Sequence, residues 1–154
     1  MNFVKVCTID APIEQLWSFL ADVAAVSGCM PGIEEFRALG ADEYEGIVRI
    51  SVGPISLRLQ GRVAVLERDQ EKWTARMHAK AKESRVTGEV KADFTSRLTR
   101  KDIALTELQI TAEARVFGKL GEFGQPIMKK TADRYLTQFA DNVARALGAV
   151  VRVD

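Results

Sequence analysis

Residues 43–69 read EYEGIVRISVGPISLRLQGRVAVLERD, and apolar and polar side chains alternate through most of this stretch. Alternation with a period of two residues is typical of β-strands that have one face against a core and the other toward solvent. Gly53 and Pro54 interrupt the pattern in the middle, where a tight turn is expected. The stretch therefore predicts two antiparallel strands that belong to a sheet with one buried face.

The strand pattern continues on both sides of this hairpin. From Ile33 to Phe117, strand-like segments are separated by short polar turns, which predicts six consecutive antiparallel strands. Residues 2–9 add another strand at the N-terminus, and it ends at a turn that contains Pro12. Two short amphipathic helices are expected next, the second of which is capped by Asp22.

A long helix is predicted near the C-terminus. After the last strand, apolar residues recur at helical spacing from Leu120 to Leu147, and this stripe is long enough to cover the buried face of the sheet. The predicted fold class is therefore α+β, with a curved antiparallel sheet of about seven strands wrapped around a long C-terminal helix. We expect one ligand-binding domain over residues 1–148 and a short tail over residues 149–154.

Small residues are frequent on the inward phase of the predicted strands. They are Gly46, Gly61, Ala75, Ala79, Ala81, Gly88, Ala92, Ala112 and Ala114. Because protein interiors are densely packed, either the helix lies close against these positions or space remains for a ligand. In the first case the glycines only permit bending, and the alanines accept bulky helix residues such as Tyr135 and Phe139. We expect the second case, an apolar ligand cavity.

Composition narrows the function classes. The chain has 154 residues, is 47% hydrophobic, and carries 22 basic and 21 acidic residues that are interspersed, which suits one globular domain. No basic stripe stands out in the sequence, so nucleic acid is not an expected partner. Cys7 and Cys29 are too few for a disulfide framework, and no secretion signal or membrane-spanning run is present. We expect a cytoplasmic protein.

Side chains that could perform catalysis are scarce on the inward phase. Nearly every strand carboxylate, lysine and arginine falls on the outward set, which predicts binding rather than catalysis, with no catalytic residue, cofactor or metal. His78, the one histidine, is outward, so a histidine metal cluster is excluded. Cys29 is either a reactive thiol or, as we expect, a small buried hydrophobe. The glycine-rich segment 118–124 is expected to form a hinge or gate.

The candidate ligand-binding residues are inward aromatic and aliphatic side chains: Trp17, Met30, Tyr44, Val48, Leu57, Leu59, Trp73, Met77, Phe94, Leu120, Phe123, Ile127 and Tyr135. Trp17 and Trp73 either stack on a flat ligand or only pack in the core. Tyr44 and Tyr135 carry hydroxyls that could bind a carbonyl or quinone oxygen, or instead a backbone carbonyl. The expected apolar gate consists of Met30, Pro31, Leu120 and Phe123.

Several short motifs together resemble one known family. They are Ala11-Pro12 followed by Leu16-Trp17, Asp22, Cys29-Met30-Pro31-Gly32, Tyr44-Glu45-Gly46, Val52-Gly53-Pro54-Ile55, Gly61, and Gly118 through Phe123-Gly124. With these motifs, the chain from residue 1 to about residue 147 resembles the carbon monoxide dehydrogenase CoxG family. That family lies within the START-like helix-grip superfamily, also called SRPBCC or polyketide-cyclase.

The resemblance implies a non-catalytic binder or carrier of a hydrophobic small molecule, such as a quinone or a lipid-like compound. It also implies an accessory role to a molybdenum hydroxylase of the carbon monoxide dehydrogenase type, with peripheral contact at the inner face of the membrane. One alternative is an assembly or membrane-recruitment factor that binds the hydroxylase directly. Another is an enzyme of the cyclase or dehydratase kind, which the scarcity of inward acid and base groups disfavours.

Overall fold

The computed structural model describes residues 1–83, 85 and 87–153, and it has the α+β architecture expected from the sequence. Its described strands form one antiparallel sheet of eight, in the order β2-β3-β4-β5-β6-β7-β1-β8. The strands are β1 (Asn2–Ile9), β2 (Ile33–Gly40), β3 (Glu43–Val52), β4 (Ile55–Asp69), β5 (Thr74–Glu83), β6 (Gly88–Asp102), β7 (Leu105–Gly118) and β8 (Val151–Val153). The helices are α1 (Ile13–Ala21), α2 (Val23–Ser27), the 3-10 helix η1 (Lys119–Phe123) and α3 (Gln125–Ala146).

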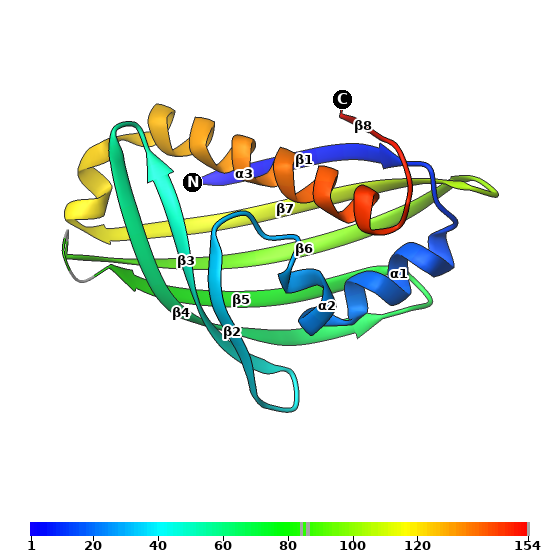
Figure 1. The fold of residues 1–154 in the computed structure, drawn as a ribbon, viewed down its shortest axis with the longest axis horizontal. Coiled ribbons are helices and arrows are strands. Elements are labelled where there is room, and N and C mark those ends of the chain that lie inside the picture. The colour runs from blue at the N-terminus through cyan, green and yellow to red at the C-terminus, as the bar shows by residue number, and fades with distance from the viewer. Residues whose placement is uncertain (84, 86, 154) are drawn as a thin grey trace.

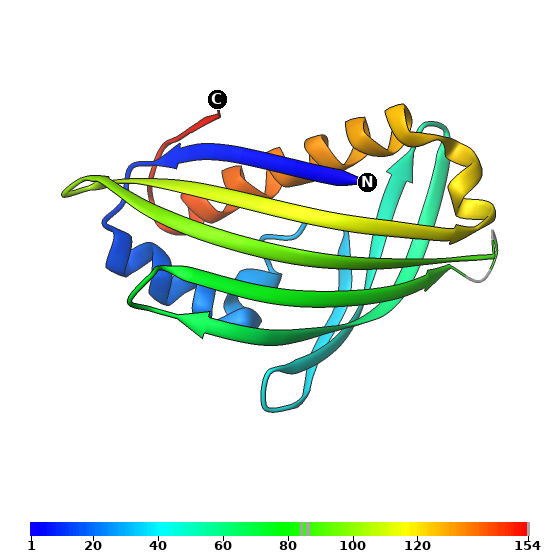
Figure 2. The same cartoon turned by 180° about the vertical axis from the view of Figure 1, so that it is seen from behind.

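The helices cover the concave side of the sheet. α3 lies along its open side and contacts β1, β3 and β8 (Figure 1). α1 packs against β6 and β7 and α2 packs against β2, so these two helices close one end. η1 contacts β6 and β7 and closes the opposite end, which the reverse view also shows (Figure 2). The concave side is thus enclosed by the sheet and by α3, with α1 and α2 at one end and η1 at the other.

The helix boundaries follow local sequence signals, with one difference from the prediction. The predicted cap of the second helix is confirmed, because the Asp22 side chain accepts a hydrogen bond from the Ala25 N–H at 3.2 Å. The long helix, however, begins after Gly124 rather than at Leu120. Gly124 has a φ of +86°, which is outside the helical region, so Leu120 and Phe123 belong to η1 instead of α3.

The C-terminal residues also differ from the expected tail. Residues 151–153 form β8, which pairs antiparallel with Cys7–Ile9 of β1. The Asp10 N–H donates to the Val150 carbonyl at 3.0 Å and continues this pairing beyond the strand. The sheet therefore has eight strands rather than about seven. A strand of three residues is too short for alternation to reveal it in the sequence.

Gly46 of β3 lies opposite Gly61 of β4 in the register of the sheet. A Cβ atom at position 46 would lie 2.5 Å from the Glu35 carbonyl oxygen, and one at position 61 would lie 2.4 Å from the Lys80 carbonyl oxygen. Both distances are shorter than a van der Waals contact, so only glycine lets the backbones approach this closely. At these two positions the small residues make room for neighbouring backbone rather than for a ligand.

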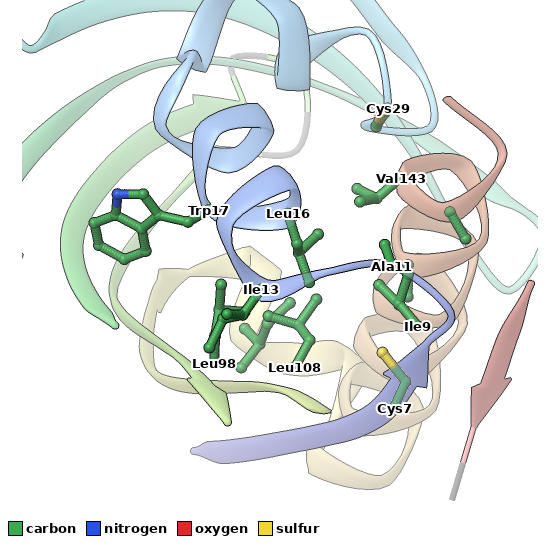
Figure 3. Packing of buried hydrophobic residues seen from close by; sticks show 13 residues of the cluster. Cys7, Ile9, Ala11, Ile13, Leu16, Trp17, Cys29, Leu98, Leu108 and Val143 are labelled. Atoms are coloured by element: carbon green, nitrogen blue, oxygen red, sulfur yellow. The ribbon is translucent and has the colours of Figure 1, made fainter. Parts of the chain in front are cut away.

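The hydrophobic core is divided into two clusters at opposite ends of the concave side. The larger cluster lies between α1, β1 and the C-terminal half of α3, and Figure 3 shows Leu16 and Val143 pointing into it from the two helices. The smaller cluster consists of Val52, Leu57, Leu59 and Leu120. A Cβ atom on Gly88 would lie 2.3 Å from Leu120 Cγ, so this glycine makes room for the Leu120 side chain of η1 rather than for a ligand.

One carboxylate is buried at the end of β5. Glu83 is 3% exposed, and it accepts hydrogen bonds from the backbone N–H groups of Arg58 and Arg85. Burial by itself raises the pKa of the Glu83 carboxyl, but these two N–H groups and the charges of the same two arginines outweigh it. The net pKa therefore lies below the ordinary value of a glutamate. Glu83 joins the ends of β4 and β5 as a carboxylate.

We predict that Glu83→Gln lowers the free energy of unfolding at pH 7 by about 1–3 kcal/mol, because the amide satisfies one N–H donor and repels the other. Since the folded-state pKa of Glu83 is lowered, its contribution is complete above the unfolded-state pKa and is lost as pH falls through the folded-state pKa. Urea unfolding at several pH values between about 3 and 7 measures this. Glu113→Gln, at an exposed position, is the control. If the difference in unfolding free energy between Glu83→Gln and the original protein is the same at every pH, the prediction is contradicted.

Candidate ligand-binding site

One row of inward residues crosses the middle of the sheet. The register places Tyr44, Val63, Ala79, Ala92 and Ala114 opposite one another from β3 to β7. The last three are alanines, and both Val63 and Ala79 keep accessible surface although they lie on central strands. Ala92 and Ala114 are buried, so space along the row is confined to the surroundings of Val63 and Ala79.

A second inward row lies beside the first. Val65, Met77 and Phe94 face one another on β4, β5 and β6, and all three are only partly buried. Phe94 packs against the larger cluster, whereas Val65 and Met77 lie between the clusters. Inward side chains of central strands are normally the most deeply buried in a sheet. In this structure they remain partly accessible between the two ends of the concave side.

The N-terminal half of α3 is held by polar contacts rather than by core packing. The buried residues of α3 all lie between positions 140 and 144. Earlier in the helix, Asp133 Oδ1 lies 2.9 Å from Lys5 Nζ, and the Tyr135 hydroxyl accepts a hydrogen bond from the Ser51 N–H at 2.9 Å. These contacts tie the helix to β1 on one side of the opening and to β3 on the other.

Lys5 is an inward-facing charge, contrary to the outward placement expected for strand lysines. It shares a face of β1 with the fully buried Ile9, is itself 8% exposed, and reaches Asp133 at the seam between β1 and α3. The sequence does not show which set of alternate residues in β1 faces inward, because Val4 and Val6, on the opposite face from Lys5, are also apolar. Val4 is 60% exposed, so the register with β7 rather than hydrophobicity decides which face is inside.

The two tryptophans face each other at the α1 end of the concave side. Their ring centroids are 5.7 Å apart and their planes meet at 80°, which is an edge-to-face pair. Trp17 belongs to the larger cluster and Trp73 packs against it. Their positions satisfy the packing alternative, while a contact with a ligand stays a prediction.

The two tyrosines have different partners. Tyr44 stacks on Phe36, with ring centroids 5.3 Å apart and planes at 18°. Tyr135 accepts from the Ser51 N–H, and the guanidinium group of Arg134 lies 5.3 Å from the Tyr135 ring centroid. Because Tyr135 acts as the acceptor in the bond with Ser51, its hydroxyl retains a hydrogen to donate.

The other candidate residues are divided between the ends and the middle of the concave side. Leu57, Leu59 and Leu120 are in the smaller cluster, and Val48 and Phe123 pack against it. Met77 and Phe94 lie on the central strands, Met30 is partly buried after α2, and Ile127 is exposed on the first turns of α3. The structure thus places the predicted set along the whole length of the concave side rather than in one spot.

The remaining chemically active side chains are engaged or buried. Cys29 is 5% exposed, and burial raises the pKa of its thiol, which keeps the thiol protonated. His78 lies on the outer face with its Nδ1 2.8 Å from Asp93 Oδ1. No group of three or more histidine, cysteine or carboxylate side chains that could hold a metal occurs among the described residues. None of the described helices combines the length and apolar character needed to cross a bilayer.

A groove of about 880 Å³ lies on the outer face of the sheet rather than on the concave side. Its lining includes Glu34, Glu35, Arg37, Arg62 and Lys80. The charged walls distinguish this groove from the apolar interior that the sequence predicts for a hydrophobic ligand.

Solved structures share this fold over nearly the whole chain. A conserved protein from Geobacillus kaustophilus has a TM-score of 0.85 at 20% identity, with 99% of each chain covered. A START superfamily protein from Mycobacterium smegmatis has a TM-score of 0.70 at 16% identity, covering 96% of this chain and 97% of that one. For the Zhui aromatase/cyclase from Streptomyces sp. R1128 the TM-score is 0.66 at 17% identity, and 96% and 93% are covered. The predicted START-like helix-grip fold is confirmed.

Sequence comparison identifies the family. No protein with curated annotation matches the chain. The sequence model of CoxG, a subunit of carbon monoxide dehydrogenase, matches residues 7–148, a range that includes all of the candidate ligand-binding residues. The family resemblance of the short motifs is therefore confirmed, and the chain belongs to the carbon monoxide dehydrogenase CoxG family.

Proposed function

We propose that this chain is a non-catalytic carrier of a hydrophobic small molecule, with a quinone as the leading candidate, that serves a molybdenum hydroxylase of the carbon monoxide dehydrogenase type. The observation that carries the proposal is the partial accessibility of inward side chains between the two core clusters. Val63, Met77 and Ala79 present accessible apolar surface there. Covering this surface with an apolar ligand removes both partners from water, which is favourable.

A quinone suits the shape and polarity of this region. Its ring is flat and apolar, so it can lie against Val63, Met77 and Ala79, which keep accessible surface. Its carbonyl oxygens need a hydrogen-bond donor, and the Tyr135 hydroxyl retains a hydrogen while it accepts from Ser51. One donor above apolar walls orients such a ligand without reacting with it.

The attachment of α3 supports uptake and release of a ligand. Its C-terminal half is fixed in the larger cluster, where Val143 is fully buried, while its N-terminal half is held by the Lys5–Asp133 and Ser51–Tyr135 contacts. The Arg134 guanidinium also donates to the Ser51 carbonyl oxygen. Breaking these polar contacts at the rim exposes little apolar surface, so it costs far less than separating a packed core. The N-terminal half of α3, together with η1, is the proposed gate.

The inward charged side chains already have hydrogen-bond or ion-pair partners within the protein, which supports binding rather than catalysis. Lys5 is paired with Asp133, and Glu83 accepts two backbone hydrogen bonds. A general acid or base must instead reach the reacting group of a bound substrate. Cys29 is a protonated thiol, which is a weak nucleophile.

The proposed place of action is the cytoplasmic face of the membrane. Three large apolar side chains are exposed near the η1 end: Ile55 at 40%, Phe117 at 45% and Ile127 at 47%. The β3–β4 turn, the end of β7 and the start of α3 meet at this end (Figure 1). Peripheral contact of these side chains with a bilayer would bring the proposed gate to the source of a lipid-soluble cargo.

We predict that Ala79→Leu weakens binding of a short-chain ubiquinone at least tenfold, because the larger side chain occupies the proposed ligand space. Ala64→Leu makes the same change on the neighbouring strand but on the outer face, and its affinity should stay within twofold of the original. Quenching of Trp17 and Trp73 fluorescence measures binding. Absence of quenching in the unmodified protein, together with no quinone or lipid in organic extracts of it, would refute the carrier proposal.

Thermal unfolding of the same pair of variants tests the space itself. If the region around Ala79 is unfilled, leucine is accommodated there and the melting temperature stays close to that of the original protein. If side chains fill the region, overpacking lowers the stability by about 1–3 kcal/mol. The second result, with unchanged melting for Ala64→Leu, would contradict an unfilled interior.

We predict that Asp133→Asn speeds release of the ubiquinone several-fold, because it removes the anion that holds Lys5 at the rim of the gate. The stability loss should be about 1 kcal/mol, since the Asp133 side chain is mostly exposed. Stopped-flow tryptophan fluorescence measures the release rate. Asp141→Asn, at an exposed position on the same helix, is the control, and equal rates for the two variants would rule out this contact as a latch.

A further inference from the structure

The outer face of the sheet carries a row of four like charges. The register places Arg62 of β4 opposite Lys80 of β5, Lys80 opposite Lys91 of β6, and Lys91 opposite Arg115 of β7. Side chains directly opposite on antiparallel strands lie about 5 Å apart at Cβ, and like charges in such pairs are destabilising. We call Arg62, Lys80, Lys91 and Arg115 the basic row; it crosses the strands seen together in Figure 2.

The chain neutralises this row only in part. Lys80 pairs with Glu89 at 3.2 Å, and Lys91 lies 5.6 Å from the centroid of the Phe117 ring. The pKa of the Glu89 carboxyl is lowered, first by Lys80 and also by the charges of Lys91 and Lys82 beside it. Among the described residues, neither Arg62 nor Arg115 has an acidic side chain within ion-pair distance.

The surface beside the row is hollow and carries acidic groups on one side. The lining of the outer groove of about 880 Å³ includes Arg62, Lys80 and Lys82 from β4 and β5, and Glu34, Glu35, Arg37 and Glu45 from β2 and β3. A flat bilayer would leave the hollow empty. An extended protein segment can enter the groove while its carboxylates lie over the basic row, so the shape favours a protein partner.

We infer that the basic row is a docking surface for an acidic, extended segment of a partner protein. Four neighbouring strands span about 14 Å across the row. An extended segment with carboxylates at alternate residues places three of them within about the same length, because a strand rises about 3.4 Å per residue. Charge complementarity then relieves the repulsion within the row on binding. This surface is on the opposite side of the sheet from the proposed ligand space and does not depend on it.

The test uses a fluorescent peptide with glutamate at alternate positions, added to the full chain without quinone. Lys91→Gln/Arg115→Gln should weaken peptide binding at least tenfold at low salt. Arg97→Gln/Lys72→Gln removes the same charge at two exposed positions toward the other end of the sheet, and it should change binding less than twofold. Equal losses in the two double variants would overturn the assignment, because they would indicate attraction to net charge alone.

Two further probes separate the partner classes. Vesicles that contain phosphatidylglycerol and a single-stranded oligonucleotide should bind weakly and with equal affinity to both double variants. Tighter binding of either probe than of the peptide, lost only in the Lys91→Gln/Arg115→Gln variant, would overturn the assignment to a protein. The outcome is independent of quinone binding, so either proposal can fail alone.

Stability gives a second readout of the same row. Relief of like-charge repulsion should raise the melting temperature of Arg115→Gln by about 1–3 °C, from the size of cross-strand pair energies and the dependence of melting on stability. Arg97→Gln, at an exposed position on the neighbouring strand, is the control. A fall in melting temperature for Arg115→Gln, with no change for the control, would contradict the inference that the row is strained in the free protein.

Discussion

The packing of the C-terminal half of α3 against β1 is the contact on which the rest of the structure depends. Ala140, Val143 and Ala144 are 0%, 0% and 2% exposed, and small residues at two of these positions let the helix lie close to the sheet. This contact holds α3 over the open side of a sheet that would otherwise expose its whole concave face. Because it lies at one end, the remainder of the helix needs only rim contacts.

The sequence predicts the elements and their faces well where alternation is long. The six strands between Ile33 and Phe117 and the Asp22 cap are confirmed, since each depends on neighbouring residues alone. Features set by distant pairing are missed. The inward position of Lys5 depends on the register with β7, and β8 depends on pairing with β1. The basic row is likewise invisible along the chain, because its members are interspersed with acidic residues until four strands align.

The candidate site is predictable in outline but not in detail. Residue phase identifies which side chains face inward, and it correctly places Ala79 and Met77 on the concave side. It cannot distinguish a small residue that leaves space from one that accepts a neighbour. Gly46 and Gly61 allow close backbone approach and Gly88 receives Leu120. Ala79 keeps accessible surface, whereas Ala92 and Ala114 are buried. That distinction needs interatomic distances, which sequence alone does not supply.

The unequal size of the two core clusters implies a gradient of local unfolding along the molecule. The larger cluster joins β1, α1 and the last turns of α3, while the smaller one consists of four residues around Leu120. Segments with few buried contacts open far more often than the whole protein unfolds. Backbone amides around η1 should therefore exchange with solvent through frequent local opening, and those of β1 through rare global unfolding. The fold can thus remain intact at the end that holds the larger cluster while the end around η1 opens locally.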